Sequence, residues 1–303
     1  MDKLLYDKLA EALRQRVSDL EQRLKSATTS SVSSLKNMNG YTQRLPEISS
    51  YGKNVSVIEI DMNLLKEIND HYGHHSGDTL LRCLGIAMVE VTAAHMGLLA
   101  FDESGTSMAP KNAVRENQEN DGQYVSRIRN QAREKDIYHI GGDEFRIIVK
   151  HKDSNLENIR AADQAFMSEV AKRFDTLWKK VRVGIKDDQG SPCLVDASFS
   201  YGFANTAEPM LEDKTVVQVQ RVADNRAIYM KAWQKLTGLV KSPAGRSFDD
   251  LRNDPRLKGL EKLRTHEELF QFIEAKEKSY LGGERREKDR RGLERCGEQN
   301  AGV

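Results

Sequence analysis

The stretch Gly141-Gly142-Asp143-Glu144-Phe145 lies between two apolar, β-prone runs, residues 136–140 and 145–149. This pattern predicts a β-hairpin whose tip carries two glycines and two carboxylates. Glycine has no Cβ, so the backbone of such a tip can approach a ligand closely. Adjacent carboxylates repel each other unless a cation or a proton neutralises one of them. The stretch therefore predicts a metal–phosphate site rather than a plain turn.

Length and charge narrow the classes of protein to which this chain can belong. Its 303 residues suffice for one large domain or two modest ones. The net charge of +1 argues against a dedicated nucleic-acid binder, whose binding domain is usually strongly basic. Cys83, Cys193 and Cys296 are widely separated, which indicates reduced thiols. Since no signal peptide or membrane-spanning run is evident, we expect a cytoplasmic protein with no membrane span.

The order of the predicted elements indicates an α+β fold. Strands are expected at residues 55–61, 136–140, 145–149 and 197–204, and helices at residues 64–71, from Asp78 onward, at 155–180 and at 216–239. Strands interleaved with helices, with a hairpin among them, match the ferredoxin-like βαββαβ topology. We therefore expect a mostly antiparallel sheet with helices packed on it.

Three parts are expected along the chain. Residues 1–44 are predicted to form a helix and a linker, residues 45–242 the α+β domain, and residues 243–303 a helical extension. The extension is expected to end in a disordered, charged tail from residue 282. A polar stretch at residues 102–123 predicts a long loop, inside an insertion at about residues 95–130.

The N-terminal residues 1–26 are predicted to form an amphipathic helix. Its apolar stripe consists of Leu9, Leu13, Val17, Leu20 and Leu24. Such a stripe fits a helix that packs on its own domain, and it fits a stalk that pairs with a second copy equally well. The sequence leaves both alternatives open.

Asp61 is the last residue of the first predicted strand, and Asp143 lies at the predicted hairpin tip. If the two strands are neighbours, both carboxylates meet at one edge of the sheet. Two hard oxygen donors suit Mg²⁺, which keeps water and substrate phosphates as its other ligands. Taken singly, each residue is better explained as a helix cap or a turn residue. The segment that follows Asp61 decides between these interpretations.

Residues 61–78 resemble the GGDEF family of diguanylate cyclases, whose pattern reads D-x-D-x-F-K-x-I-N-D-x-x-G-H-x-x-G-D and whose name is the pentapeptide of residues 141–145. Residues 197–204 and 223–229 resemble later blocks of the family, so the resemblance covers about residues 45–240. It implies a palm of the nucleotide-cyclase type with helical extensions at both ends.

The resemblance also implies a role for each matching position. Mg²⁺, or Mn²⁺, would be held by Asp61, the Met62 carbonyl, Asp143 and Glu144. Asp143 and Glu144 would be the catalytic residues, with Glu144 either contacting the metal or helping to deprotonate the ribose 3′-hydroxyl. Substrate would be bound by Asn69 and Asp78 at the guanine edge, and by Leu64, Leu65, Lys66, Gly141 and Gly142 at the phosphates.

The reaction implied by the resemblance condenses two GTP into cyclic di-GMP with release of pyrophosphate. Each 3′-hydroxyl attacks the α-phosphate of the other GTP, so a homodimer is part of the mechanism. An inhibitory product site in the family uses R-x-x-D before the hairpin. Arg133 and Asp136 have that pattern, one residue closer to the glycines than usual.

Several positions depart from the family pattern. The second acid after the first strand is Asn63, and the usual arginine before the double glycine is His139. The late lysine that contacts phosphates in the family has no clean counterpart in this sequence.

A catalytically weak or inactive module that binds GTP or cyclic di-GMP is the main alternative function. A cyclase that makes a different product and a palm-like polymerase are further ones. A protein partner is also expected at the terminal helices, and no nucleic acid.

Overall fold

In the computed structural model, residues 3–115, 119–211, 214–240 and 249–277 are described. The chain divides into two compact units, residues 1–228 with 242–245, and residues 229–241 with 246–303. The predicted disordered tail, residues 282–303, lies outside the described residues. In the second unit the described helical pieces are residues 229–236 at the end of α7 (Val216–Leu236), α8 (Asp249–Arg252), η1 (Leu260–Lys262) and residues 266–277.

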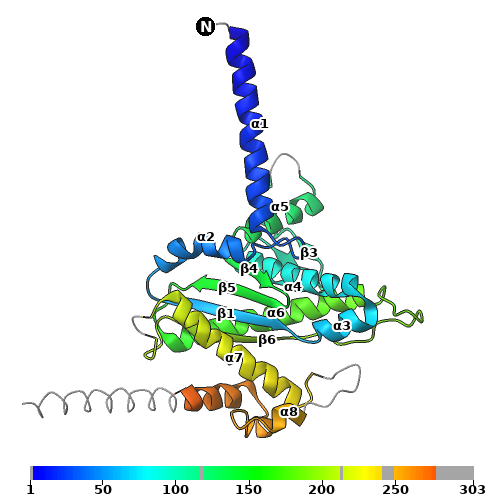
Figure 1. The fold of residues 1–303 in the computed structure, drawn as a ribbon, viewed down its shortest axis with the longest axis vertical. Helices are drawn as coiled ribbons and strands as arrows, with labels where there is room; N and C mark the ends of the chain where they lie inside the picture. The colour runs from blue at the N-terminus through cyan, green and yellow to red at the C-terminus, as the bar shows by residue number, and fades with distance from the viewer. Residues whose placement is uncertain (1–2, 116–118, 212–213, 241–248, 278–303) are drawn as a thin grey trace, which may run out of the picture. The chain divides into compact units, whose positions relative to one another are not determined.

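The first unit is built on a four-stranded antiparallel sheet (Figure 1). Its strands are β1 (Val55–Met62), β4 (Ile137–Gly141), β5 (Glu144–Lys150) and β6 (Phe199–Asn205), in the order β4-β5-β1-β6. This strand order, together with the helices between β1 and β4 and between β5 and β6, confirms the predicted α+β fold with a ferredoxin-like sheet.

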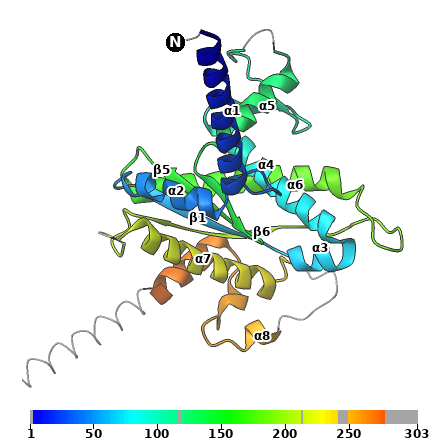
Figure 2. The same ribbon diagram turned by 45° about the horizontal axis from the view of Figure 1, so that its top comes forward.

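Helices cover both faces of the sheet, because successive side chains of a strand point to opposite faces. Val55 and Val57 of β1 pack with Tyr41 of α2 (Met38–Ser49) and Val219 of α7 (Val216–Leu236). Ser56 points to the other face and donates to Asp163 of α6 (Leu156–Arg182), at 2.5 Å. Figure 2 shows α4 (His74–His95) and α6 on one side and α7 on the other. The strands are thus buried on both faces.

The region predicted as a long loop holds more regular structure than expected. Two short strands, β2 (Ala100–Phe101) and β3 (Ser107–Met108), pair with each other, and α5 (Asp121–Arg133) begins within the predicted loop. Glu90 of α4 explains this order, because a fully buried carboxylate needs partners. Ser107, Arg129 and Arg173 all donate to it.

The predicted start of the second helix was wrong. The short helix α3 (Leu65–Tyr72) ends at Gly73, and α4 begins at His74 rather than at Asp78. Gly73 has a φ of 80°, which glycine adopts without strain. The Gly73 carbonyl accepts a hydrogen bond from the amide of Ser76, so α4 starts directly after α3 with no linker between them. Asp78 therefore lies in the second turn of α4 and does not cap it.

The stripe of the N-terminal helix α1 (Lys3–Thr28) is exposed. Leu13, Val17, Leu20 and Leu24 retain 50–58% of their accessible surface. In the described chain this stripe does not pack on its own domain, so the first of the two alternatives for the helix is wrong. α2 was not predicted; its N-terminus is capped by Asn37, whose side chain accepts from the amide of Gly40.

Gly202 of β6 allows α7 to lie against the sheet. A Cβ at this position would stand 2.2 Å from the Ala223 carbonyl oxygen and 2.3 Å from the Ala227 nitrogen. Because both are backbone atoms, we expect Gly202→Ala to destabilise the fold by about 3 kcal/mol in urea denaturation. Gly122→Ala, where a Cβ meets nothing closer than 3.4 Å, is the matched control and should not lose stability. Equal stability of both variants would contradict this packing.

Candidate active site

The pairing of β1 with β5 brings the acidic residues of the two strands together. Asp61 lies directly opposite Glu144 in the antiparallel register, so their side chains share one face of the sheet. The Met62 amide donates to the Asp143 carbonyl at 2.9 Å, which ties the hairpin tip to the end of β1. The structure thus brings together the four residues predicted to hold a metal.

The electrostatics of Glu144 show how close these acids are. Its pKa is raised above the usual value, first by burial and then by the negative charges of Asp143, Asp224 and Asp61. Arg146 opposes this shift only in part. Carboxylates crowded in this way are stabilised by a cation.

A cavity of about 200 Å³ opens beside these acids, on the sheet face that α2 and α7 cover. Its charged and polar lining consists of Glu59, Asp61, Glu144, Arg146, Gln220 and Asp224. Arg146 is buried, donates from Nε to Glu59 at 2.5 Å, and stacks on the Tyr41 ring at 4.3 Å. Its Nη1 has no hydrogen-bond partner among the described residues. Burial raises the pKa of Glu59 to about 7, against the opposing effect of Arg146.

Sequence reasoning missed four of these residues, Glu59, Arg146, Gln220 and Asp224. For the first two, the signal was the period of two along a strand. Glu59 precedes Asp61 by two positions and Arg146 follows Glu144 by two, so all four side chains share one face. Asp224 lies on α7, and the sequence alone does not predict that α7 packs on this face of the sheet.

The donor set fits Mg²⁺ in its chemistry. Carboxylate and carbonyl oxygens are the ligands this ion prefers, and it needs few of them from protein when phosphates and water supply the rest. Over the described residues, no three His, Cys, Asp or Glu side chains form a metal-binding group by themselves. A metal here would therefore depend on substrate oxygens as well as on Asp61, Asp143 and Glu144.

Asn69 and Asp78, predicted at the guanine edge, lie where neither serves as a helix cap. The Asn69 Oδ1 is buried without a hydrogen-bond partner in the described part of the chain. It packs so closely on Gly77 that a Cβ there would stand 1.9 Å away. An unsatisfied buried acceptor costs about 1–3 kcal/mol, so a ligand donor at this place would stabilise the site.

Open backbone surrounds the predicted phosphate site. A Cβ on Gly141 or Gly142 would meet nothing within 4 Å, and Gly142 has a φ of 57°. Leu64 also has a left-handed backbone, and no side chain caps the first turn of α3. The amides at this helix start, near Leu65 and the exposed Lys66, are suited to bind an anion.

Asn63 stands where the family pattern has an acid, and its side chain has structural partners. Asn63 is fully buried and exchanges side-chain hydrogen bonds with Ser198 and Ser200 at 3.1 Å, so it holds β1 to the β6 side of the sheet. The acid usual at this position would lose one of these bonds, because an ionised carboxylate only accepts.

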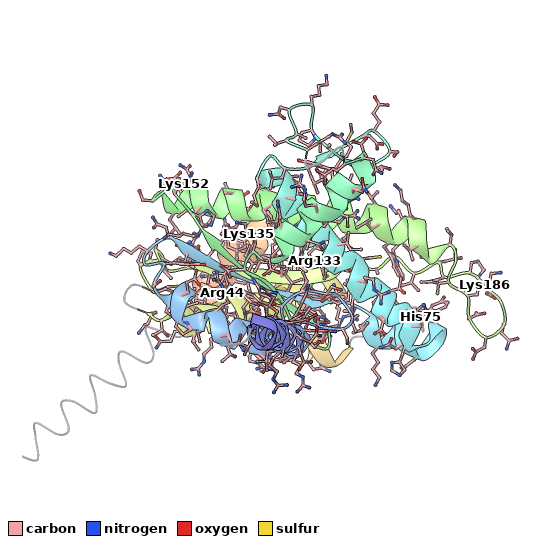
Figure 3. All side chains as sticks on the ribbon, turned by 90° about the horizontal axis from the view of Figure 1, so that it is seen from above. Arg44, His75, Arg133, Lys135, Lys152 and Lys186 are labelled. Carbon is pink, nitrogen blue, oxygen red and sulfur yellow. The ribbon has the colours of Figure 1, made fainter. Side chains whose placement is uncertain are left out.

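The predicted inhibitory pair has other contacts. Asp136 accepts from the hydroxyls of Tyr51 and Tyr138 at 2.7 Å and from Arg44 of α2 at 3.2 Å. Arg133 donates to Asn130 on its own helix, and Figure 3 labels Arg44 on α2 and Arg133 on α5. An inhibitory product site at Arg133 and Asp136 stays a prediction.

Comparison with protein families agrees with this geometry. Residues 31–99 match the family model described as "Diguanylate cyclase, GGDEF domain". This part of the chain is thus similar to the GGDEF domain of diguanylate cyclases. The match to the GGDEF domain includes Asp61, Asn69 and Asp78, and confirms the predicted resemblance. It begins ahead of the predicted domain start at residue 45, which stays a prediction. A search of curated proteins finds no match.

Solved GGDEF structures are distant neighbours. The coiled coil and GGDEF domain of DgcB from Caulobacter crescentus, in complex with c-di-GMP, is 19% identical with a TM-score of 0.48, over 75% of this chain and 92% of that one. Diguanylate cyclase SiaD from Pseudomonas aeruginosa, in complex with its activator SiaC, is 19% identical with a TM-score of 0.44, over 75% and 66%. Vibrio cholerae LapD, bound to c-di-GMP, is 15% identical with a TM-score of 0.41, over 75% and 39%.

The charges around Glu144 predict how its carboxyl group titrates. Removing a neighbouring negative charge by Asp61→Asn should lower the pKa of Glu144, because its ionised form is then less disfavoured. The carboxyl ¹³C shift of Glu144 measures this, and added Mg²⁺ should lower the pKa in the native chain as well. Asp188→Asn on an exposed loop is the control. An unchanged pKa in Asp61→Asn would contradict the proximity of the two acids.

Proposed function

We propose that this GGDEF domain is a diguanylate cyclase that condenses two GTP into cyclic di-GMP and releases pyrophosphate. The observation that carries the proposal is the register of β1 and β5, which sets Asp61 opposite Glu144 beside Asp143. The three acids assigned to the metal, Asp61, Asp143 and Glu144, are all present, and they lie within range of one another's charge. A binding module that had lost catalysis would have no need to keep them.

Different residues of the chain would bind the guanine and the phosphates of one GTP. Asn69 and Asp78 would bind guanine, since an amide and a carboxylate together match its acceptor and donor edge. The open backbone at Gly141 and Gly142 and the uncapped start of α3 would hold the phosphates.

The acidic edge would hold Mg²⁺ or Mn²⁺ through Asp61, the Met62 carbonyl, Asp143 and Glu144. When bound, the ion supplies charge neutralisation at the phosphates and lowers the pKa of an oxygen nucleophile. Glu144, whose pKa is raised by burial and by its acidic neighbours, would receive the proton of the ribose 3′-hydroxyl. Most of the rate enhancement would come from orientation of the two substrates.

A homodimer is part of the proposal, because each domain holds one GTP. The exposed stripe of Leu13, Val17, Leu20 and Leu24 has the spacing of a coiled-coil seam and would pair with a second copy of α1. Over the described residues, no helix is long and apolar enough to cross a membrane. The expected cytoplasmic location and a protein partner at the terminal helices stay predictions.

The main alternative is a GGDEF module that binds GTP or cyclic di-GMP without turnover. One observation favours it: the family's arginine before the double glycine is His139, whose pKa is lowered by burial and which is therefore uncharged near neutral pH. That change removes a fixed cation close to the tip.

Incubation of the full chain with Mg²⁺ and GTP, followed by chromatography of the products, tests the proposal. The native protein should form cyclic di-GMP, with a rate per chain that rises with protein concentration as dimers form. Asp143→Asn should lose at least about a hundredfold of this rate, while Asp188→Asn should keep it. Binding of GTP without product, at concentrations where dimers are demonstrated, would reject the cyclase in favour of the binding module.

A further inference from the structure

The imidazole of His139 lies between the turn that follows α1 and the tip of the hairpin. It is buried with 6% of its surface exposed and stacks on Phe145, with ring centroids 4.3 Å apart. Its Nδ1 lies 2.9 Å from the Ser30 hydroxyl and 3.1 Å from the Ser33 hydroxyl. Its Nε2 lies 3.0 Å from the Gly142 carbonyl oxygen. One side chain thus spans two segments that are far apart in the sequence.

The surrounding hydrogen bonds determine which nitrogen carries the proton. The Ser30 oxygen accepts from the amides of Val32 and Ser33, and the Ser33 oxygen accepts from the amide of Leu35. The Gly142 carbonyl oxygen can only accept, so in the neutral ring Nδ1 is the unprotonated nitrogen, whose lone pair accepts from the serine hydroxyls. Nε2 is consequently the protonated nitrogen, and it donates to the carbonyl of Gly142.

This bond constrains Asp143 from one side. The peptide carbonyl before Asp143 is held by His139, and the carbonyl of Asp143 itself is held by the Met62 amide of β1. Gly142 has a φ of 57°, and a Cβ at this position would meet nothing within 4 Å in the described part of the chain, so no close side-chain packing restrains that peptide. Both peptide planes that flank the catalytic aspartate are therefore fixed, one by the backbone and one by an imidazole.

The turn that holds the imidazole is itself docked on the sheet. Thr29 pairs with Lys36 across the turn, and Lys36 pairs with Tyr138 of β4 as a parallel bridge. The amide of His139 donates to the Lys36 carbonyl at 2.8 Å. Since α1 ends at Thr28, the path from α1 to Asp143 consists of one tight turn and one side chain.

We propose that His139 is a positioning residue, which transmits the placement of Ser30 and Ser33 after α1 to the peptide before Asp143. In this role it acts through the Gly142 carbonyl rather than on a metal or a substrate. The effect of His139 on turnover rests on the proposed cyclase function. Its effect on the conformation of the hairpin tip does not.

Three variants of the full chain separate positioning from simple packing. His139→Phe keeps a ring against Phe145 and loses the hydrogen bonds at both ring nitrogens, whereas His139→Gln keeps one donor and one acceptor. The double variant S30A/S33A leaves the imidazole intact and removes the donors to Nδ1. His95→Gln, at a half-exposed histidine paired with Glu169, is the matched control.

The kinetic measurement is kcat and KM for GTP. His139→Phe should lose about tenfold or more in kcat, because a small displacement of a catalytic group is costly, with little change in KM. His139→Gln should recover most of the loss, and S30A/S33A should resemble His139→Phe. Native kcat in His139→Phe would overturn the proposal, as would failure of glutamine to restore more activity than phenylalanine does.

A spectroscopic measurement decides the case in which the native chain makes no product. Imidazole ¹⁵N shifts should identify His139 as the Nε2–H tautomer, and S30A/S33A should displace both these shifts and the Gly142 carbonyl ¹³C shift. Such displacement supports positioning even if the cyclase proposal has failed. Unchanged Gly142 and Asp143 signals in S30A/S33A and in His139→Phe would overturn the inference independently of activity.

Discussion

The antiparallel pairing of β1 with β5 is the constraint on which the site depends. It joins an aspartate at the end of one strand to two acids that lie more than eighty positions later in the chain. A shift of one residue in this register would turn Asp61 to the opposite face, away from Glu144. The hydrogen bond from Met62 to Asp143 and the buried apolar side chains of β1 on both faces hold the register in place.

This pairing concentrates negative charge at one edge of the sheet, and the neighbouring cationic side chain neutralises it only in part. Arg146 neutralises Glu59 within the cavity, yet Glu144 still faces Asp61, Asp143 and Asp224. Such an arrangement is unfavourable in the protein alone and becomes favourable when a cation and phosphates are present. The conflict between stability and charge at this edge is therefore a physical argument for a ligand-binding function.

The sequence predicted those parts of the molecule that follow from local patterns. The strands and the hairpin could be predicted because β-branched residues flank Gly141 and Gly142. The ferredoxin-like topology was inferred from the order of strands and helices along the chain. The start of α4 at His74 was missed because Gly73 lets two helices meet without a linker. Asp224 and the Ser30–Ser33 contacts of His139 depend on tertiary placement, for which single residues carry no signal.

Paramagnetic broadening tests the shared cation at this edge most directly. With Mn²⁺ and a non-hydrolysable GTP analogue bound to the full chain, the carboxyl ¹³C signals of Asp61, Asp143 and Glu144 should broaden together, while that of Asp188 should stay sharp. Broadening of Asp61 without the hairpin acids, or of neither, would contradict the account, because the ion would then not lie between the two strands.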